Sequence, residues 1–246
     1  MMLSAVFINN KKWKIETANM TTFLVYQHNY SFIDIGLFKN KQVIEKVTTD
    51  KTLASKNIIP LTDTLLKKHN IKLDETSFIA VNQGPGPFTT LRTVIATVNG
   101  ISFASQIPLI GIDGLKALAT EYHRKGFVTI TLLNAYSNDV YWAITNKNGQ
   151  TTSTGCENIL KLLQAMAEKY CAKDIYFIGN AALLHKELIE DFFEKKLSIS
   201  DGFPQNCSIE QIASEALDKF QGAHFSKTYK VTPLYLKHGK YKIANK

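Results

Sequence analysis

The most distinctive stretch of this chain reads Val81-Asn82-Gln83-Gly84-Pro85-Gly86-Pro87-Phe88-Thr89-Thr90-Leu91-Arg92. An apolar run at 78–81 predicts a buried strand before it, and a continuous apolar face predicts a helix over 89–104 after it. A glycine-rich turn between a strand and a helix is typical of phosphate-binding sites, where free backbone N–H groups face the anion. Pro85 and Pro87 lack that N–H, and the stretch matches neither the P-loop nor the G-x-G-x-x-G pattern. These features favour a structural turn, with a phosphate site as the alternative.

Outward from this turn, each half of the chain combines antiparallel strands with strand–helix alternation. The first half begins with a predicted antiparallel meander, followed by a helix over 53–69 in which Pro60 marks the start or a kink. The other predicted strands lie at 23–26, 32–38, 43–47, 109–112, 127–133, 140–145 and 175–178, and the other predicted helices at 115–122, 158–172, 183–193 and 209–220. This order predicts an α/β protein of two lobes that divide near residues 111–114.

Residues 84–92 resemble the Gly-Pro-Gly-Ser-Phe-Thr-Gly-Leu-Arg signature of the TsaB (YeaZ) family. The similarity continues in the same order from about Phe23, through 107–112, 115–119, 132–136, 140–143, 177–181 and 233–237. The resemblance implies two actin-like ATPase (ASKHA-type) lobes, each a mixed sheet with flanking helices. It divides the chain into an N-terminal extension at 1–22, a first lobe at 23–112 and a second lobe at 113–246, whose last helix returns to the first lobe. The alternative for the extension is a translation start at Met20.

The chain departs from the family pattern where an actin-like ATPase would hold a metal–nucleotide complex. Pro87 stands where the family has serine, Thr90 where it has glycine, and Asn134 where it has aspartate. The early strand of the family reads Leu-Ala-Ile-Asp-Thr-Ser, whereas residues 24–31 here lack its acidic residue and hydroxyl cluster. The resemblance therefore implies a partner protein with no catalytic residue, metal or cofactor of its own.

The helices around residues 53–69 and 89–104 are the expected partner-binding elements. In the family this pair packs against the matching pair of the catalytic subunit TsaD as a four-helix bundle. The expected seam consists of the apolar stripes of both helices: Ile58, Leu61, Leu65, Leu91, Val94, Ile95 and Val98. The motif turn itself supplies Gly84, Pro85, Gly86, Pro87, Phe88, Thr89 and Arg92. Taken alone, such a stripe is also what a plain core face looks like.

Arg92 is expected near the start of the second of these helices, where a cation opposes the helix dipole. Something must favour it there, and a carboxylate of this chain or an acidic group of a partner are the two alternatives.

The function implied by the resemblance is that of a scaffold. The chain would bind a TsaD-like subunit and help form the docking site for a TsaE-like ATPase. The assembly transfers a threonylcarbamoyl group to the adenosine beside the anticodon, with tRNA held indirectly. Two alternatives remain, an ATP-hydrolysing enzyme of the same fold and a stand-alone tRNA-binding protein, and a homodimer is the alternative assembly when the partner is absent.

The charge of the chain bears on the tRNA-binding alternative. The net charge of +8 suggests nucleic acid as a ligand. However, Arg92 and Arg124 are the only arginines, and lysine lacks the planar fork that suits phosphates and base edges. Biased composition is therefore favoured over a dedicated nucleic-acid surface.

The remaining sequence features point to a cytoplasmic protein without catalytic machinery. Three cysteines (Cys156, Cys171 and Cys207) match no zinc or redox spacing and favour a reduced compartment with inert thiols. No apolar run is long enough to span a membrane. The histidines form no metal-binding pair, and no serine lies in a G-x-S-x-G elbow. Asp113 and Asp139 are expected as a helix cap and part of a solvated turn rather than as a catalytic pair.

Overall fold

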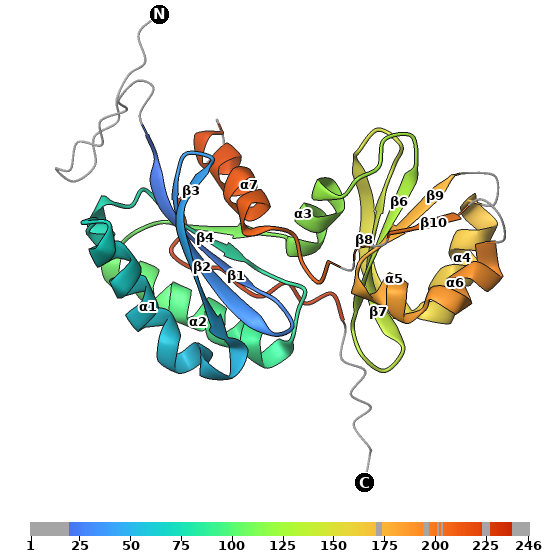
Figure 1. Ribbon diagram of the computed structural model, residues 1–246, viewed down its shortest axis with the longest axis horizontal. Coiled ribbons are helices and arrows are strands. Elements are labelled where there is room, and N and C mark those ends of the chain that lie inside the picture. The colour runs from blue at the N-terminus through green and yellow to red at the C-terminus, as the bar shows by residue number, and fades with distance from the viewer. Residues whose placement is uncertain are drawn as a thin grey trace, which may run out of the picture.

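The computed structural model describes residues 20–170, 174–193, 197–200, 202, 204–222 and 227–237. Most of the expected N-terminal extension lies outside these ranges, as does Cys171. Figure 1 shows two lobes side by side, each built on one twisted sheet with helices against it. Both sheets are five-stranded and mixed. This confirms the predicted α/β fold of two lobes, each a mixed sheet with flanking helices.

The first sheet has the strand order β3-β2-β1-β4-β5. Its strands are β1 (Thr22–His28), β2 (Phe32–Lys39), β3 (Gln42–Asp50), β4 (Ile79–Asn82) and β5 (Leu109–Ile112). The first three form the predicted antiparallel meander, and β4 and β5 add in parallel to β1. The carboxyl ends of β1 and β4 therefore meet at one edge of the sheet, and the motif turn follows directly from β4.

Both faces of the first sheet are covered, so its central strand is apolar almost throughout. Leu24 and Tyr26 of β1 face the core formed with α1 (Ala54–Lys68) and α2 (Phe88–Ser105). Phe23 and Val25 point the opposite way, because side chains alternate across a strand. They pack in a second core with α3 (Gly114–Glu121) and α7 (Ile209–Gln221). In this way α7, late in the chain, lies against the first sheet (Figure 1).

The second sheet repeats the connectivity of the first, in the order β8-β7-β6-β9-β10. Three antiparallel strands come first and two parallel strands follow. The elements are β6 (Val128–Asn134), β7 (Asp139–Thr145), β8 (Thr151–Asn158), α4 (Ile159–Tyr170), β9 (Ile175–Ile178), α5 (Asn180–Leu184), α6 (Lys186–Phe193) and β10 (Leu197–Ile199). Helices α4, α5 and α6 form a third core with this sheet. Single 3-10 turns at Lys51–Leu53 and Leu73–Glu75 complete the elements of the described residues.

The structure corrects several element predictions. Strands β8 and β10 were not predicted, because β8 is a polar edge strand without apolar alternation and β10 has three residues. The single helix predicted at 183–193 is two helices that meet at His185. Helix α1 begins at Ala54 and contains Pro60, so Pro60 does not start it.

The C-terminal segment at 228–237 has no regular secondary structure and connects the two lobes. The Leu109 N–H donates to the Thr228 carbonyl at 2.7 Å, and the Leu234 N–H donates to the Gln83 carbonyl at 2.8 Å. Beyond these contacts with the first lobe, the Lys237 ammonium donates to the Ala135 carbonyl of the second lobe at 2.9 Å. The segment therefore fixes the lobes relative to each other beside the motif turn.

Candidate functional site

A cavity of about 1020 Å³ lies where the two lobes meet, and the motif turn forms one of its walls. The first lobe supplies the start of α2, the second lobe supplies the turn between β6 and β7, and the C-terminal segment closes the site. We call this cavity the interlobe cleft. Its lining residues are Lys51, Gly86, Pro87, Phe88, Thr89, Thr90, Leu91, Arg92, Asn134, Ala135, Tyr136, Tyr141, Leu234, Tyr235 and Lys237.

The start of the motif turn is held by hydrogen bonds within the chain. Gly84 adopts φ +103° before a cis peptide bond to Pro85. Its N–H donates to the Asn82 side-chain oxygen at 2.8 Å, and its carbonyl accepts from the Gly114 N–H at 2.9 Å. The Gly84 N–H is thus already used, and Pro85 and Pro87 have none. Three backbone positions that a phosphate cradle could use are unavailable, which supports the structural reading of this turn.

His28, at the end of β1, packs directly behind the turn. A Cβ atom placed on Gly86 would lie 2.6 Å from Cε1 of His28, so only glycine fits here without displacing the ring. His28 is fully buried, and neither ring nitrogen has a hydrogen-bond partner of good geometry among the described residues. Burial lowers the pKa of His28 to about 4, against a smaller opposing effect of the Asn82 backbone. The imidazole is therefore neutral near pH 7 and behaves as packing for the turn.

Gln27 lies where the resemblance places the family's acidic residue, and it serves a structural purpose. Its Nε2 donates to the Cys207 carbonyl at 2.6 Å, and its Oε1 accepts from Asn82 Nδ2 at 3.2 Å. The side chain therefore connects β1 and β4 to Cys207, two residues before the start of α7. A neutral amide with both ends engaged is a poor metal ligand, in contrast to a carboxylate.

Arg92 lies in a cage of aromatic side chains and forms no ion pair with a carboxylate of the described residues. Its Nε donates to the Tyr235 hydroxyl at 2.8 Å. The guanidinium carbon lies 3.9 Å from the centroid of the Phe88 ring and 5.7 Å from that of Tyr235. Cation–π attraction and a neutral acceptor thus hold this cation near the start of α2. Neither of the two expected acidic partners is needed to explain its position.

The β6–β7 turn forms the opposite wall of the cleft. Tyr136, Ser137 and Asn138 all have φ near +60°, a left-handed conformation that is costly for tyrosine. The Lys237 ammonium secures this turn through the Asp139 carboxylate at 2.9 Å and the Ala135 carbonyl. From the first lobe, the Tyr30 hydroxyl donates to the Asn134 carbonyl at 2.6 Å. Contacts from both lobes therefore hold this unusual turn in place.

The structure places the residues of the expected partner seam in the core of the first lobe. Ile58, Leu65, Leu91, Val94, Ile95 and Val98 are at most 3% exposed, and all belong to the core between α1, α2 and the first sheet. Leu61 is half-buried against the same core. The prediction that this stripe meets a partner is wrong for the six buried side chains, because the sheet of the same chain already covers them.

The outer sides of the same two helices expose further apolar side chains, and we call these two sides the α1/α2 outer face. Phe103 is 75% exposed on α2, and Ile59 is 59% exposed on α1. Ala96 and Gly100 lie on the exposed side of α2, and a Cβ on Gly100 would meet nothing within 4 Å. Small residues beside large apolar ones let a second helix approach closely, so this face suits helix–helix packing.

Metal-binding side chains do not gather in the described part of the chain. No cluster of three His, Cys, Asp or Glu side chains there could hold a metal ion. Asp113 caps α3 by accepting from the Leu115 and Lys116 N–H groups, as predicted. Burial raises the pKa of the Cys156 thiol to about 11 and raises that of Cys207 as well, so neither is an activated nucleophile. No helix among the described residues has the length and apolar content to cross a bilayer.

Sequence reasoning missed several residues of this site, among them His28, Tyr136, Tyr235 and Lys237. The meeting of β1 and β4 at one sheet edge could have placed His28 behind the turn. Tyr235 and Lys237 carried no local signal, because they reach the cleft only through the return of the chain's last segment. The left-handed conformation of Tyr136 is equally invisible, since tyrosine is not a usual residue for it.

Comparisons with known proteins agree on one family. The model of the family described as TsaD, tRNA N6-adenosine threonylcarbamoyltransferase, matches residues 49–244. The tRNA threonylcarbamoyladenosine biosynthesis protein TsaB of Bacillus subtilis is 27% identical over 183 residues, which cover 72% of this chain and 78% of that protein. TsaB of Haemophilus influenzae is 24% identical over 199 residues, covering 75% and 80%.

Other relatives match over a shorter stretch or in structure alone. The chain spans 63% of the length of each of two Buchnera TsaB proteins, at 27% and 25% identity over 52% and 54% of this chain. Among solved structures, YeaZ from Pseudomonas aeruginosa superposes with a TM-score of 0.68 over 88% of this chain and 100% of that one, at 19% identity. That match shows the shared fold.

Proposed function

Because the chain belongs to the TsaB (YeaZ) group of the threonylcarbamoyltransferase family, we propose that it is the non-catalytic scaffold subunit of a tRNA-modifying complex. In this role it binds a TsaD-like subunit and holds that subunit in its active arrangement. The partner transfers the threonylcarbamoyl group to the adenosine next to the anticodon. A TsaE-like ATPase docks on the complex, and tRNA is held by the assembly as a whole. The setting is the cytoplasm.

The observation that carries this proposal is the α1/α2 outer face. Phe103 and Ile59 expose most of their surface to water, and large apolar side chains exposed on helices suit contact with a partner. Helical partners bury such faces, and two helices on each side would make a four-helix seam. The proposed seam is therefore on the same two helices as expected from the sequence, and it uses their outer residues.

The site chemistry supports a non-catalytic role. Gln27 and Asn134 replace the acidic residues of the family pattern, and Gln27 is engaged with Cys207 and Asn82. The Asn134 side-chain oxygen accepts from the Tyr136 N–H at 2.8 Å and so stabilises the β6–β7 turn. Side chains that would hold a metal–nucleotide complex in this fold thus serve as internal hydrogen-bonding groups.

The test is heterodimer formation between the purified full chain and its cognate TsaD, measured by light scattering. We expect a 1:1 complex with the native chain and loss of the complex with Phe103→Glu, because the new carboxylate would be buried in the seam. The matched control is Leu160→Glu, which changes a 48% exposed leucine of α4 in the other lobe. The proposal fails if the native chain forms no heterodimer, or if both variants bind equally well. A homodimer formed by the chain alone is expected to dissociate when TsaD is added, because both would use the same face.

One alternative function has an observation in its favour. The interlobe cleft lies where ATPases of this fold bind nucleotide, and the exposed Thr89 lines it, while Thr90 is buried. An ATP-hydrolysing enzyme predicts steady ATP turnover by the chain alone and loss of that turnover in Thr89→Ala. Absence of turnover in the native chain excludes this alternative.

A further inference from the structure

The interlobe cleft exposes an unusual number of aromatic rings. Phe88 is 56% exposed, Tyr136 55% and Tyr235 47%, and all three line the same cavity. They come from three separate segments: the start of α2, the β6–β7 turn and the C-terminal segment. Exposed rings that converge on one cavity are platforms on which planar groups stack.

The same walls are positively charged. Lys51, Arg92 and Lys237 line the cleft, and no lining residue is acidic. Two carboxylates lie beside these cations: Asp139 binds Lys237, and Asp50, next to Lys51, caps a 3-10 turn by accepting from Thr52. The lining residues themselves carry three positive charges and no negative one. Its lining thus combines stacking surfaces with cations.

The motif turn argues against a free nucleoside triphosphate as the ligand. A triphosphate with its metal ion requires clustered backbone N–H donors and carboxylates for the metal. Pro85 and Pro87 remove two such donors, the Gly84 N–H is bonded to Asn82, and the described residues hold no metal cluster. Dispersed cations such as Lys51 and Arg92 suit phosphodiesters instead, which carry one charge each.

We propose that the interlobe cleft binds unpaired nucleotides of an RNA strand. Bases stack on Tyr136 and on the Phe88–Tyr235 pair, whose ring centroids lie 5.9 Å apart, while Lys51 and Arg92 contact the flanking phosphates. Single-stranded RNA is recognised through this pairing of aromatic stacking with positive charge. The proposed function enters this inference only by identifying the RNA as a tRNA loop. The inference itself assigns to this chain a direct contact with the substrate.

The position of the cleft fits that assignment. Phe88, Thr89 and Arg92 belong to the first turns of α2, and Phe103 of the α1/α2 outer face lies near the end of the same helix. A partner docked on that face would lie along α2 and come close to the cleft. An RNA strand in the cleft would then lie beside the catalytic subunit.

The test uses a fluorescent single-stranded RNA of about 12 nucleotides, the full chain and binding measured by anisotropy over a salt series. Tyr136→Asn removes one ring, and asparagine tolerates φ near +60° better than tyrosine, so the substitution adds no backbone strain to the turn. We expect its affinity for the RNA to fall about tenfold, the effect of losing one stacked base. We expect Lys51→Gln to lower the slope of log affinity against log salt by about 0.7.

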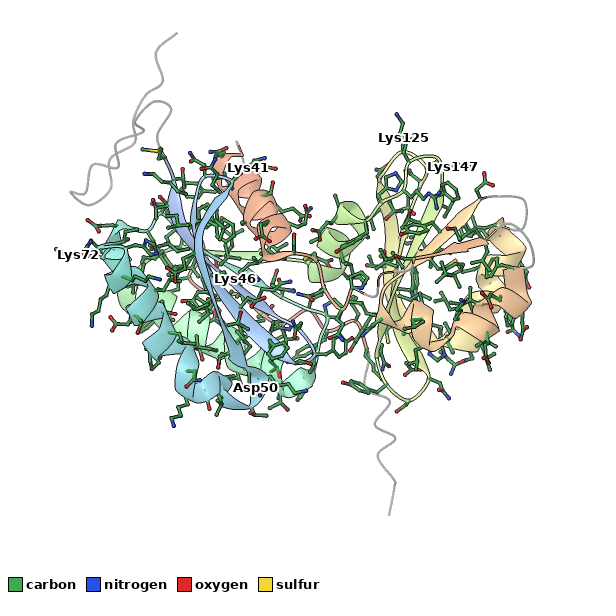
Figure 2. The ribbon with its side chains drawn as sticks, viewed as in Figure 1. Lys41, Lys46, Asp50, Lys72, Lys125 and Lys147 are labelled. Atoms are coloured by element: carbon green, nitrogen blue, oxygen red, sulfur yellow. The ribbon has the colours of Figure 1, made fainter. Side chains whose placement is uncertain are left out.

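The matched control is Lys125→Gln, which removes an exposed lysine of the second lobe. Figure 2 shows Lys125 at the top of that lobe and Asp50, the neighbour of Lys51, at the bottom of the first lobe. Native affinity in Tyr136→Asn, or an equal loss of salt slope in Lys125→Gln, would overturn the cleft as the RNA site. Displacement of the RNA by AMP or ATP at the same nucleotide concentration would overturn it in favour of a free-nucleotide site.

The heterodimer measurement separates the two proposals. If the native chain binds TsaD but not the RNA probe, the cleft inference alone fails. If it binds the RNA probe, with the expected loss in Tyr136→Asn, but does not bind TsaD, the scaffold role alone fails.

Discussion

The Nε of Arg92 and the hydroxyl of Tyr235 form a 2.8 Å hydrogen bond between residues 143 positions apart in the chain. This bond connects helix α2 with the segment that returns from the end of the chain. Phe88 completes the contact, because its ring packs on the guanidinium and lies beside the Tyr235 ring. The three side chains form one wall of the interlobe cleft, and they explain why a cation is tolerated near the start of α2.

Tyr235→Phe is expected to lower the free energy of unfolding by less than about 1 kcal/mol. The substitution removes one hydrogen bond at an exposed position and keeps both ring contacts, and such a bond contributes modestly. Chemical denaturation measures the change. Tyr235→Ala serves as the comparison, since it also removes the stacking on Phe88 and should cost more; equal costs for both variants would contradict the cage described here.

The buried imidazole of His28 is expected to make stability depend on pH. Native His28 has a pKa of about 4, whereas an exposed histidine titrates near 6.5. Between these values the unfolded chain binds a proton that the native chain does not. The free energy of unfolding therefore falls as the pH drops from about 6.5 to about 4, by about 3 kcal/mol in total.

His28→Leu isolates this effect, because leucine is apolar and cannot bind a proton. Denaturation of the native chain and the variant at about pH 7 and about pH 4.5 should show a smaller loss for the variant. Glu45, whose pKa is lowered by Lys68 and His69, also contributes pH dependence, but it is present in both proteins. A native chain and a variant that lose equal stability on acidification would show that His28 is not held neutral.

Gly86→Ala is expected to destabilise the chain by about 1 to 3 kcal/mol, the usual cost of overpacking. The new methyl group would lie 2.6 Å from the His28 ring, which is only 1% exposed. Gly100→Ala is the matched control. It adds the same methyl group where nothing lies within 4 Å, inside a helix, and should stabilise by about 0.5 to 1 kcal/mol. Thermal or chemical denaturation of both variants decides, and equal effects would contradict the close packing at Gly86.

Leu65→Ala and Ile59→Ala should distinguish a residue of the buried core from a residue of the proposed partner seam. Leu65 is 1% exposed in the core of the first lobe, so its truncation should cost about 2 to 5 kcal/mol of stability. Ile59 is 59% exposed, so its truncation should leave stability within about 0.5 kcal/mol and weaken only the TsaD complex. Denaturation measures the stability of both variants, and heterodimer titration measures their affinity for TsaD. A stable Leu65→Ala protein that fails to bind TsaD would restore the buried stripe as the seam.

Much of the fold could be predicted because it depends on local patterns. The strand at 78–81, the motif turn and the helix after it were all recognisable, since apolar periodicity and turn residues are read over a few positions. Strand β8 was not predicted because its side chains are polar. It is a strand because it pairs with β7 at the edge of the sheet, and that pairing is not visible in the local sequence. The same limit applies to the split between α5 and α6, which no proline or glycine marks.

The sequence by itself determined the two-lobed α/β plan, the structural character of the proline-bearing turn and the identity of the helices proposed to meet a partner. The tertiary structure alone decided which faces of those helices are free. The stripe of Val94 and Val98 is covered by the first sheet, whereas Phe103 is not. It also decided that Arg92, Tyr136 and Tyr235 share one cleft. The physical reason is that periodicity reports only that a helix face is apolar. What covers that face depends on contacts between residues far apart in the chain.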